Sequence, residues 1–118
     1  MKKKEEGSIG EALAEKYLKN KGYKILGRNF FSPFGELDLI ALDGDVVVFV
    51  EVKTRSSNAF GSPIEAITPI KQRNMTKTAS YFLQKNNLFG KVQTRFDGVS
   101  IMFSNVLDYE IEHIENIF

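Results

Sequence analysis

The pair Asp43-Gly44, set between two apolar segments, constrains the fold of this chain more than any other feature. An Asp-Gly pair favours the two-residue turns that connect antiparallel strands, because glycine accepts a positive φ. The flanking segments, 35–42 and 45–54, are rich in the apolar side chains that favour strands. The sequence therefore predicts a central β-hairpin in which Leu42 pairs with Asp45.

The sequence also predicts two helices. Residues 8–21 carry apolar side chains at helical spacing, and Ser8 with Glu11 matches the capping-box pattern of a helix start. Thr68-Pro69 predicts a second helix running to about residue 86, because threonine caps well and proline fits the first helical position. Residues 1–6 are expected to form a frayed terminus.

Further strands are expected at 23–28, 95–103 and 107–114, with a polar loop at 56–63. The resulting order, αβββαββ, is that of an α/β sandwich in which helices flank a mixed central sheet. A chain of 118 residues can bury one continuous core, so we expect a single domain spanning 1–118.

The composition limits the functions open to such a domain. The net charge is only +1, so nucleic-acid binding would need charges sorted onto one face. The chain has no cysteine, which excludes disulfides and thiolate metal ligands. The longest apolar run, Val46 to Val50, is too short to cross a membrane. These features predict a cytoplasmic protein without a membrane partner.

Three ionisable residues of the hairpin are expected on one face of the sheet. Glu51 and Lys53 are two positions apart, and strand side chains alternate between faces, so these two share a face. With the turn at its predicted position, Asp38 lies opposite Phe49 and one diagonal step from Glu51. A slip of one residue would separate the groups, so the prediction depends on the register.

Two carboxylates and a lysine are costly to bury unless they serve a purpose. Asp38 and Glu51 offer the hard oxygen ligands that suit Mg²⁺ or Mn²⁺, and such an ion would polarise a phosphate and activate a water molecule. Lys53 would orient that water or stabilise charge on the phosphate. A structural alternative stays open, in which Glu51 and Lys53 form an ordinary salt bridge near a strand end.

Other residues also have two interpretations each. Glu11 either completes the capping box or points into the active-site cleft, where it would hold a water or a second metal. Lys71 lies on the apolar face of the second helix, where it either reaches towards the sheet and a phosphate or extends to solvent. Glu36 is a further metal ligand or a solvated strand end. Gln72 and Arg55 are candidate nucleic-acid contacts.

Arg95 and Asp97 share a face of their strand, and we expect them to pair as part of the architecture. The only histidine, His113, lies near the C-terminus with no nucleophile beside it in the sequence. A hydrolase that uses histidine as its general base is therefore not expected.

Segments spread over almost the whole chain resemble one known family, UPF0102 (YraN). The similar segments are Gly35 to Ile40, Phe49 to Arg55, Gly10-Glu11-Ala12 with Ala14, Asn29-Phe30, Lys71-Gln72-Arg73 and Arg95-Phe96-Asp97. This family is assigned to the restriction-endonuclease-like fold of PD-(D/E)xK nucleases and resembles archaeal Holliday-junction resolvases. The resemblance implies a metal site of Asp38, Glu51 and the Val52 carbonyl, with Lys53 catalytic. It also matches Glu11 to an acidic residue on the first helix of the resolvases.

The resulting hypothesis is a hydrolase, an endodeoxyribonuclease that uses magnesium or manganese to cut branched or otherwise structured DNA. DNA is expected as the partner in preference to RNA, and resolvase-like action would require two active sites and hence a homodimer. One alternative is a non-catalytic nucleic-acid-binding module on a nuclease fold. Another is an interaction domain that binds no nucleic acid. Metal-dependent cleavage would separate the first hypothesis from the others.

Overall fold

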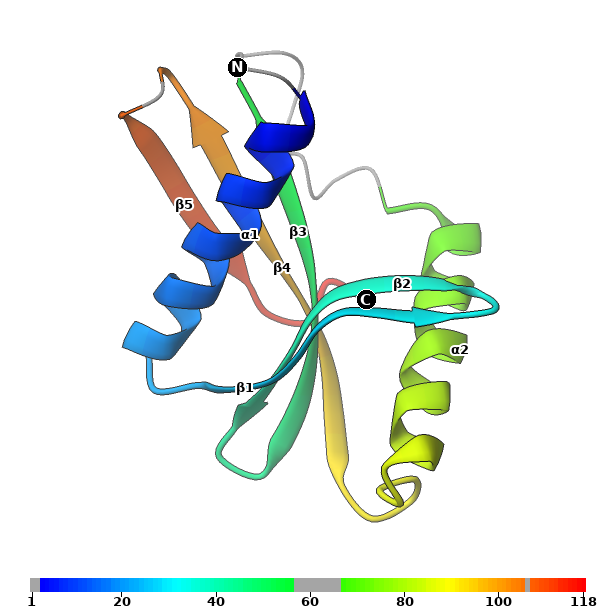
Figure 1. Cartoon of the computed structure of the whole chain (residues 1–118). Helices are drawn as coiled ribbons and strands as arrows, with labels where there is room; N and C mark the ends of the chain where they lie inside the picture. Colours follow the sequence, from blue (N-terminus) through cyan, green and yellow to red (C-terminus); the bar gives the residue numbers. More distant parts are fainter. Residues whose placement is uncertain (1–2, 57–66, 106) are drawn as a thin grey trace.

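The computed structural model describes residues 3–56, 67–105 and 107–118. Apart from Ser56, the loop expected at 56–63 lies outside the described residues. The elements are α1 (Lys3–Asn20), β1 (Lys24–Ser32), β2 (Gly35–Asp43), β3 (Val46–Arg55), α2 (Pro69–Lys85), β4 (Gln93–Phe103) and β5 (Tyr109–Ile114), as Figure 1 shows. The predicted order αβββαββ is confirmed. Within the described part of the chain, no helix is both long and apolar enough to cross a membrane.

The described strands form one five-stranded mixed sheet in the order β1-β2-β3-β4-β5. Strands β3 and β4 are parallel and are connected through α2, whereas the other neighbouring pairs are antiparallel. Helix α1 packs on one face of the sheet and α2 on the other (Figure 1). The expected α/β architecture, with helices flanking a mixed sheet, is therefore present.

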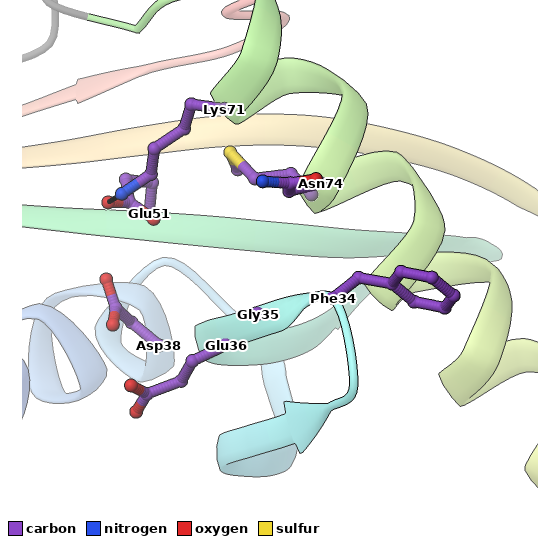
Figure 2. Close-up of a pocket in the computed structure, with 8 residues that line it drawn as sticks. Phe34, Gly35, Glu36, Asp38, Glu51, Lys71 and Asn74 are labelled. Atoms are coloured by element: carbon purple, nitrogen blue, oxygen red, sulfur yellow. Dashed lines mark ion pairs between the residues drawn. The ribbon is translucent and has the colours of Figure 1, made fainter.

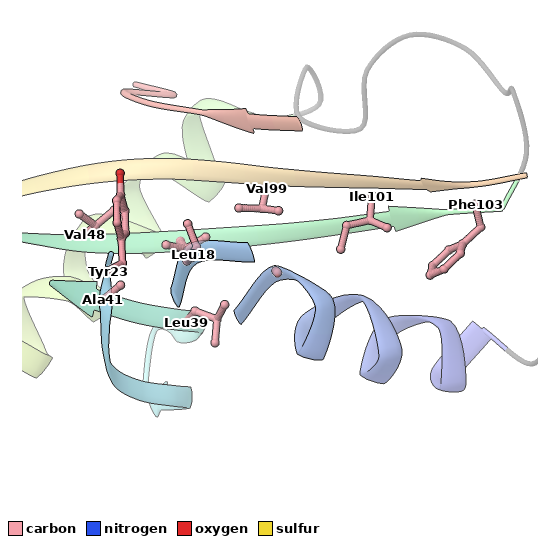
Figure 3. Close-up of a cluster of buried hydrophobic side chains, with 10 residues drawn as sticks. Leu18, Tyr23, Leu39, Ala41, Val48, Val99, Ile101 and Phe103 are labelled. Carbon is pink, nitrogen blue, oxygen red and sulfur yellow. The ribbon is translucent and has the colours of Figure 1, made fainter. Parts of the chain in front are cut away.

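Strand β3 supplies side chains to two separate cores, because its residues alternate between the faces of the sheet. Val48 and Val50 face α1, where they join the cluster shown in Figure 3 with Leu18 of the helix. Phe49 faces α2, and its ring meets that of Phe82 edge to face at 6.0 Å. The strand that carries Glu51 is thus fixed from both sides by buried apolar contacts.

The turn between β2 and β3 lies one residue later than predicted. The last pair of the ladder is Asp43–Val46, so Gly44 and Asp45 form the loop, and Gly44 has a φ of 60°. The predicted pairing of Leu42 with Asp45 is wrong, since Leu42 pairs with Val47. The whole register moves by two residues, and a shift of two leaves every side chain on its predicted face.

Helix α1 begins at Lys3 rather than at Ser8. The lysines and glutamates of residues 3–6 are good helix formers, and they extend the helix through the segment expected to be frayed. Ser8 lies inside the helix, so the capping-box interpretation of Ser8 and Glu11 is wrong. The start of α2 is as predicted: the Thr68 side chain accepts a hydrogen bond from the backbone N–H of Lys71 at 3.1 Å, and proline follows the cap.

The hairpin of β1 and β2 extends beyond the ladder between β2 and β3. That ladder ends at Leu39–Val50, whereas β1 and β2 remain paired as far as Ser32–Gly35. The extension, residues 30–37, is called the hairpin arm here, and it reaches across to α2 (Figure 1). The hydroxyl groups of Ser32 and Thr78 share a hydrogen bond of 2.8 Å that fastens the arm to the helix. The candidate site forms where the arm leaves β3.

Candidate functional site

Asp38 lies at the point where β2 separates from β3. The backbone N–H of Val52 donates a hydrogen bond of 2.7 Å to Asp38 Oδ2, so a side-chain carboxylate replaces the missing β2 partner. The N–H and C=O of one strand residue point to the same edge, so the Val52 carbonyl also faces this opening. The predicted pairing of Asp38 with Phe49 is wrong, because Ile40 is the partner of Phe49.

Glu51 is buried, at 4% exposed, and two lysines converge on it. Lys53 Nζ lies 3.4 Å from Glu51 Oε1, and Lys71 Nζ lies 2.8 Å from the same oxygen. Figure 2 shows Lys71 reaching from α2 to this carboxylate. Lys71 therefore reaches towards the sheet, which was one of its two expected positions. The salt bridge between Glu51 and Lys53 is present, but Lys71 makes the closer contact.

The carboxylates around Asp38 give the site an excess of negative charge. The pKa of Asp38 is raised to about 7, first because burial disfavours the charged form and then because Glu51 lies nearby. The hydrogen bond from Val52 opposes this rise, whereas Glu11 and Glu36 add to it. Burial and the charges of Glu36 and Glu51 also raise the pKa of Glu11. A cation would relieve this imbalance.

Two cavities border Asp38. One, of about 260 Å³, lies between the hairpin arm and α2 and is lined by Phe34, Gly35, Glu36, Asp38, Glu51, Lys71, Asn74 and Met75 (Figure 2). The other, of about 300 Å³, is lined by residues of α1, β1 and β2, among them Glu11, Arg28, Asn29 and Asp38. Each has room for several water molecules, since one water occupies about 30 Å³ in the liquid. Asp38 is therefore accessible to water.

Glu11 lies at the margin of the site, in the second cavity. With the Asn29 amide oriented so that its nitrogen faces the carboxylates, Asn29 donates to Glu11 Oε1 at 3.2 Å and to Glu36 Oε1 at 3.0 Å. Asn29 has a φ of 46°, which is unusual within a strand for a residue other than glycine. It links α1 to β2 beside the site. The role of Asn29 was not predicted, and its only signal in the sequence is its position in a segment similar to UPF0102.

The two other predicted nucleic-acid contacts lie outside this cluster. The Gln72 side chain donates a hydrogen bond of 3.4 Å to the Ile67 carbonyl, and it lines neither of the two cavities. Arg55 is exposed at the end of β3, where it pairs with Met102 of β4. The structure thus groups Asp38, Glu51, Lys53 and Lys71, and no side-chain hydrogen bond or ion pair within the described residues joins Gln72 or Arg55 to this group.

The donor set at this opening fits a divalent cation that is held by few protein ligands. In residues 3–56, 67–105 and 107–118, no three Asp, Glu or His side chains lie close enough together to surround one ion. Mg²⁺, however, usually retains several waters and takes only one or two carboxylates. Asp38 and Glu51 offer two such groups, and the Val52 carbonyl offers a third oxygen.

A second group of buried charges is architectural. Arg95 Nε donates a hydrogen bond of 2.8 Å to Asp97 Oδ1, which confirms the predicted pair, and His113 Nε2 lies 2.8 Å from Asp97 Oδ2. Burial raises the pKa of Asp97, but hydrogen bonds from His113, Arg95 and the Asn116 amide outweigh it and lower the pKa overall. The Asp97 and His113 side chains are almost fully buried, so this pair offers no surface to a substrate.

The fold and the site together define an α/β protein with a carboxylate–lysine site at the branch point of its central hairpin. The model of the uncharacterised protein family UPF0102 matches residues 10–101, and the chain belongs to this family. Similar UPF0102 proteins occur in Clostridium botulinum (43% identity over 98% of this chain and 94% of the relative), in Clostridium tetani (45% over 98% and 94%) and in Persephonella marina (46% over 95% and 91%). The resemblance seen in the sequence is confirmed.

Proposed function

We propose that this protein is a metal-dependent endonuclease that hydrolyses phosphodiester bonds in structured DNA, on a fold of the restriction-endonuclease-like, PD-(D/E)xK type. One observation carries the proposal: Asp38 and Glu51 line one water-accessible cavity at the end of the β2–β3 ladder, and the Lys53 ammonium lies 3.4 Å from Glu51. Burial and the nearby charge of Glu51 raise the pKa of Asp38 to about 7, so the charged form of this carboxylate is disfavoured in the metal-free site. Strongly perturbed carboxylates in a cleft are typical of functional sites.

The chain's own groups suggest how such a reaction would proceed. Asp38, Glu51 and the Val52 carbonyl would hold Mg²⁺ or Mn²⁺, which when bound supplies a Lewis acid for the phosphate and lowers the pKa of a water. The Val52 N–H holds the Asp38 carboxylate in one orientation. The Lys53 ammonium, already 3.4 Å from Glu51, would orient the attacking water or stabilise the charge that develops on the phosphate.

The geometry also suggests where a nucleic-acid backbone would pass. The two cavities flank Asp38. Lys71 lines one of them and Lys53 pairs with Glu51 in its wall, so phosphates would meet positive charge there. The net charge of +1 provides no general attraction for a polyanion. Binding would therefore depend on these local lysines and on the metal.

The proposal is tested by a cleavage panel of branched, duplex and single-stranded DNA and RNA, with Mg²⁺, with Mn²⁺ or with EDTA. We expect cleavage that requires the metal and favours branched DNA, with rates reduced by about 100-fold or more in Lys53→Met and Asp38→Asn. Lys85→Met, at the far end of α2, is the matched control and should cleave like the wild type. Intact substrates under all these conditions would refute the proposal.

The same panel, run as a binding assay, distinguishes the proposed nuclease from the alternative, a non-catalytic nucleic-acid-binding module. Such a module would bind nucleic acid in a salt-sensitive manner, and neither EDTA nor Lys53→Met would change its affinity. Resolvase-like cleavage of two strands would also require a homodimer on the DNA. Light scattering measures the mass of the protein–DNA complex and so gives the number of protein copies bound. A single copy that nicks one strand would exclude cleavage of two strands by a dimer.

A further inference from the structure

Lys71 makes the closer of the two ion pairs with Glu51, although it comes from helix α2 and not from the strand that carries Glu51. Its ammonium lies 2.8 Å from Glu51 Oε1, whereas that of Lys53, on the same strand as Glu51, lies 3.4 Å from this oxygen. The Glu51 side chain is only 5% exposed. A carboxylate buried to this extent needs a partner, because an unpaired buried charge is strongly destabilising. Lys71 supplies that partner.

The Lys71 side chain is nevertheless free to leave this position. Its backbone is fixed in the first turn of α2 by the Thr68 cap, but the side chain is 40% exposed and borders the cavity of about 260 Å³. A lysine side chain is a flexible stem of four carbons with a compact charge at its end. The ammonium could therefore turn from Glu51 into the cavity without movement of the helix.

A divalent cation held by Glu51 would compete with the Lys71 ammonium. The two carry like charge and use the same carboxylate, so each lowers the affinity of the other for it. Lys53 is further from Glu51, at 3.4 Å, and lies on the same strand as Glu51 and the Val52 carbonyl. Lys71 is thus the group that the binding of a cation would displace first.

We infer that Lys71 is a displaceable counter-ion: it pairs with Glu51 in the metal-free protein, and metal binding releases it to contact a phosphate of the substrate. The inference rests on the proposed function and adds an order of events to it. Metal binding frees the Lys71 ammonium for a phosphate, so bound metal should raise the affinity for nucleic acid. By linkage, each ligand then raises the affinity for the other by the same factor.

The first test measures the affinity for Mn²⁺ by isothermal titration calorimetry on the full chain without nucleic acid. Lys71→Met keeps the apolar stem and removes the competing charge, and we expect its Kd for Mn²⁺ to be about fivefold lower than that of the wild type, as for a partly exposed ion pair. Arg73→Met removes the same charge from an exposed position on the same helix and should change the Kd less than about twofold. Lys71→Arg retains the competitor and should resemble the wild type.

The second test measures the coupling in a Lys53→Met background, in which cleavage should be suppressed. We expect Mn²⁺ to tighten binding of a branched DNA when Lys71 is present, and to do so by a smaller factor in the Lys53→Met/Lys71→Met double variant. Fluorescence anisotropy of labelled DNA with Mn²⁺ or EDTA reports both affinities. Equal coupling in the two proteins would contradict the role of Lys71 at the phosphate.

The outcomes separate this inference from the proposed function. If the wild type binds Mn²⁺ and Lys71→Met binds it no more tightly, the counter-ion role is refuted while the nuclease proposal stands. If Mn²⁺ binds only to Lys71→Met, the inference is supported directly. If neither protein binds Mn²⁺, both the inference and the proposed function are wrong. Circular dichroism of each variant confirms that it is folded before its affinity is compared.

Discussion

Replacing Asp38 with asparagine should stabilise the metal-free protein at alkaline pH, although the residue lies at the heart of the candidate site. The folded-state pKa of Asp38 is about 7, against an ordinary value of 3.8. The folded protein therefore binds a proton over this interval that the unfolded chain has released, and its stability falls as the pH rises through it. Each pKa unit corresponds to about 1.4 kcal/mol, so the loss above pH 7 is at most about 4 kcal/mol.

Asparagine carries no charge, and its side-chain oxygen can still accept the hydrogen bond from Val52. We expect Asp38→Asn to raise the free energy of unfolding by about 2–3 kcal/mol at pH 8 in EDTA, because part of the maximum is offset by the weaker bond to a neutral acceptor. Only about one pKa unit of this interval lies below pH 5, so about two thirds of the loss develops between pH 5 and pH 8, and the two proteins should differ by less than about 1 kcal/mol at pH 5. Urea denaturation followed by circular dichroism measures both differences.

Metal provides the control for this prediction. Mg²⁺ should stabilise the wild type at pH 8 by an amount that grows with its concentration, about 2.7 kcal/mol at one hundred times the Kd, and should stabilise Asp38→Asn much less. The electrostatic argument is refuted if Asp38→Asn is no more stable than the wild type at pH 8. It is also refuted if the gain in free energy of unfolding is the same at pH 5 and pH 8. Either result would mean that burial of Asp38 carries no charge penalty.

Three further predictions concern the framework of the site. Gly10→Ala places a Cβ in steric overlap with Thr54 Cγ2, so we expect the variant to lose about 1–3 kcal/mol of stability in urea denaturation and to recover most of it in a Thr54→Ala background. Asp97→Asn breaks a buried, lowered-pKa ion pair and should cost about 3 kcal/mol at pH 7. That difference should narrow as the pH falls below about 4, where the wild type begins to lose the same contribution. Thr78→Val removes the hydrogen bond to Ser32 and should increase hydrogen exchange in the hairpin arm, with a loss of about 1 kcal/mol; unchanged exchange there would show that the bond does not hold the arm.

The sequence predicted the elements well, because alternation in the strands and the Thr68 cap are local signals. It placed the hairpin turn one residue early, since Asp43-Gly44 and Gly44-Asp45 both satisfy the chemistry of a tight turn. The resulting error of two positions preserved the face of Asp38 and Glu51, so the predicted convergence was correct although the predicted partner of Asp38 was not. Side-chain parity is thus better determined by a sequence than the register itself.

Other features depend on contacts that no local pattern encodes. The capping-box pattern of Ser8 and Glu11 is short, and the helix-forming residues before it override it. Two positions were open for Lys71, and only the placement of α2 against β3 decides between them. Asn29 acquires its role because the strands bring it between carboxylates from α1 and β2.

The candidate site follows from an interruption of the sheet. Because the hairpin arm leaves β3 after Leu39–Val50, the Val52 edge is open, and Asp38 satisfies its N–H with a carboxylate instead of a carbonyl. The carboxylate acceptor introduces a negative charge next to buried Glu51. Two features of the site each compensate part of this charge. A proton is retained on Asp38 near neutral pH, and Lys71 reaches across from α2 to Glu51. Both compensations are reversible, whereas an apolar residue at position 38 would have removed the problem permanently. A fold that keeps such a charge and neutralises it only reversibly is suited to the binding of a cation at that position.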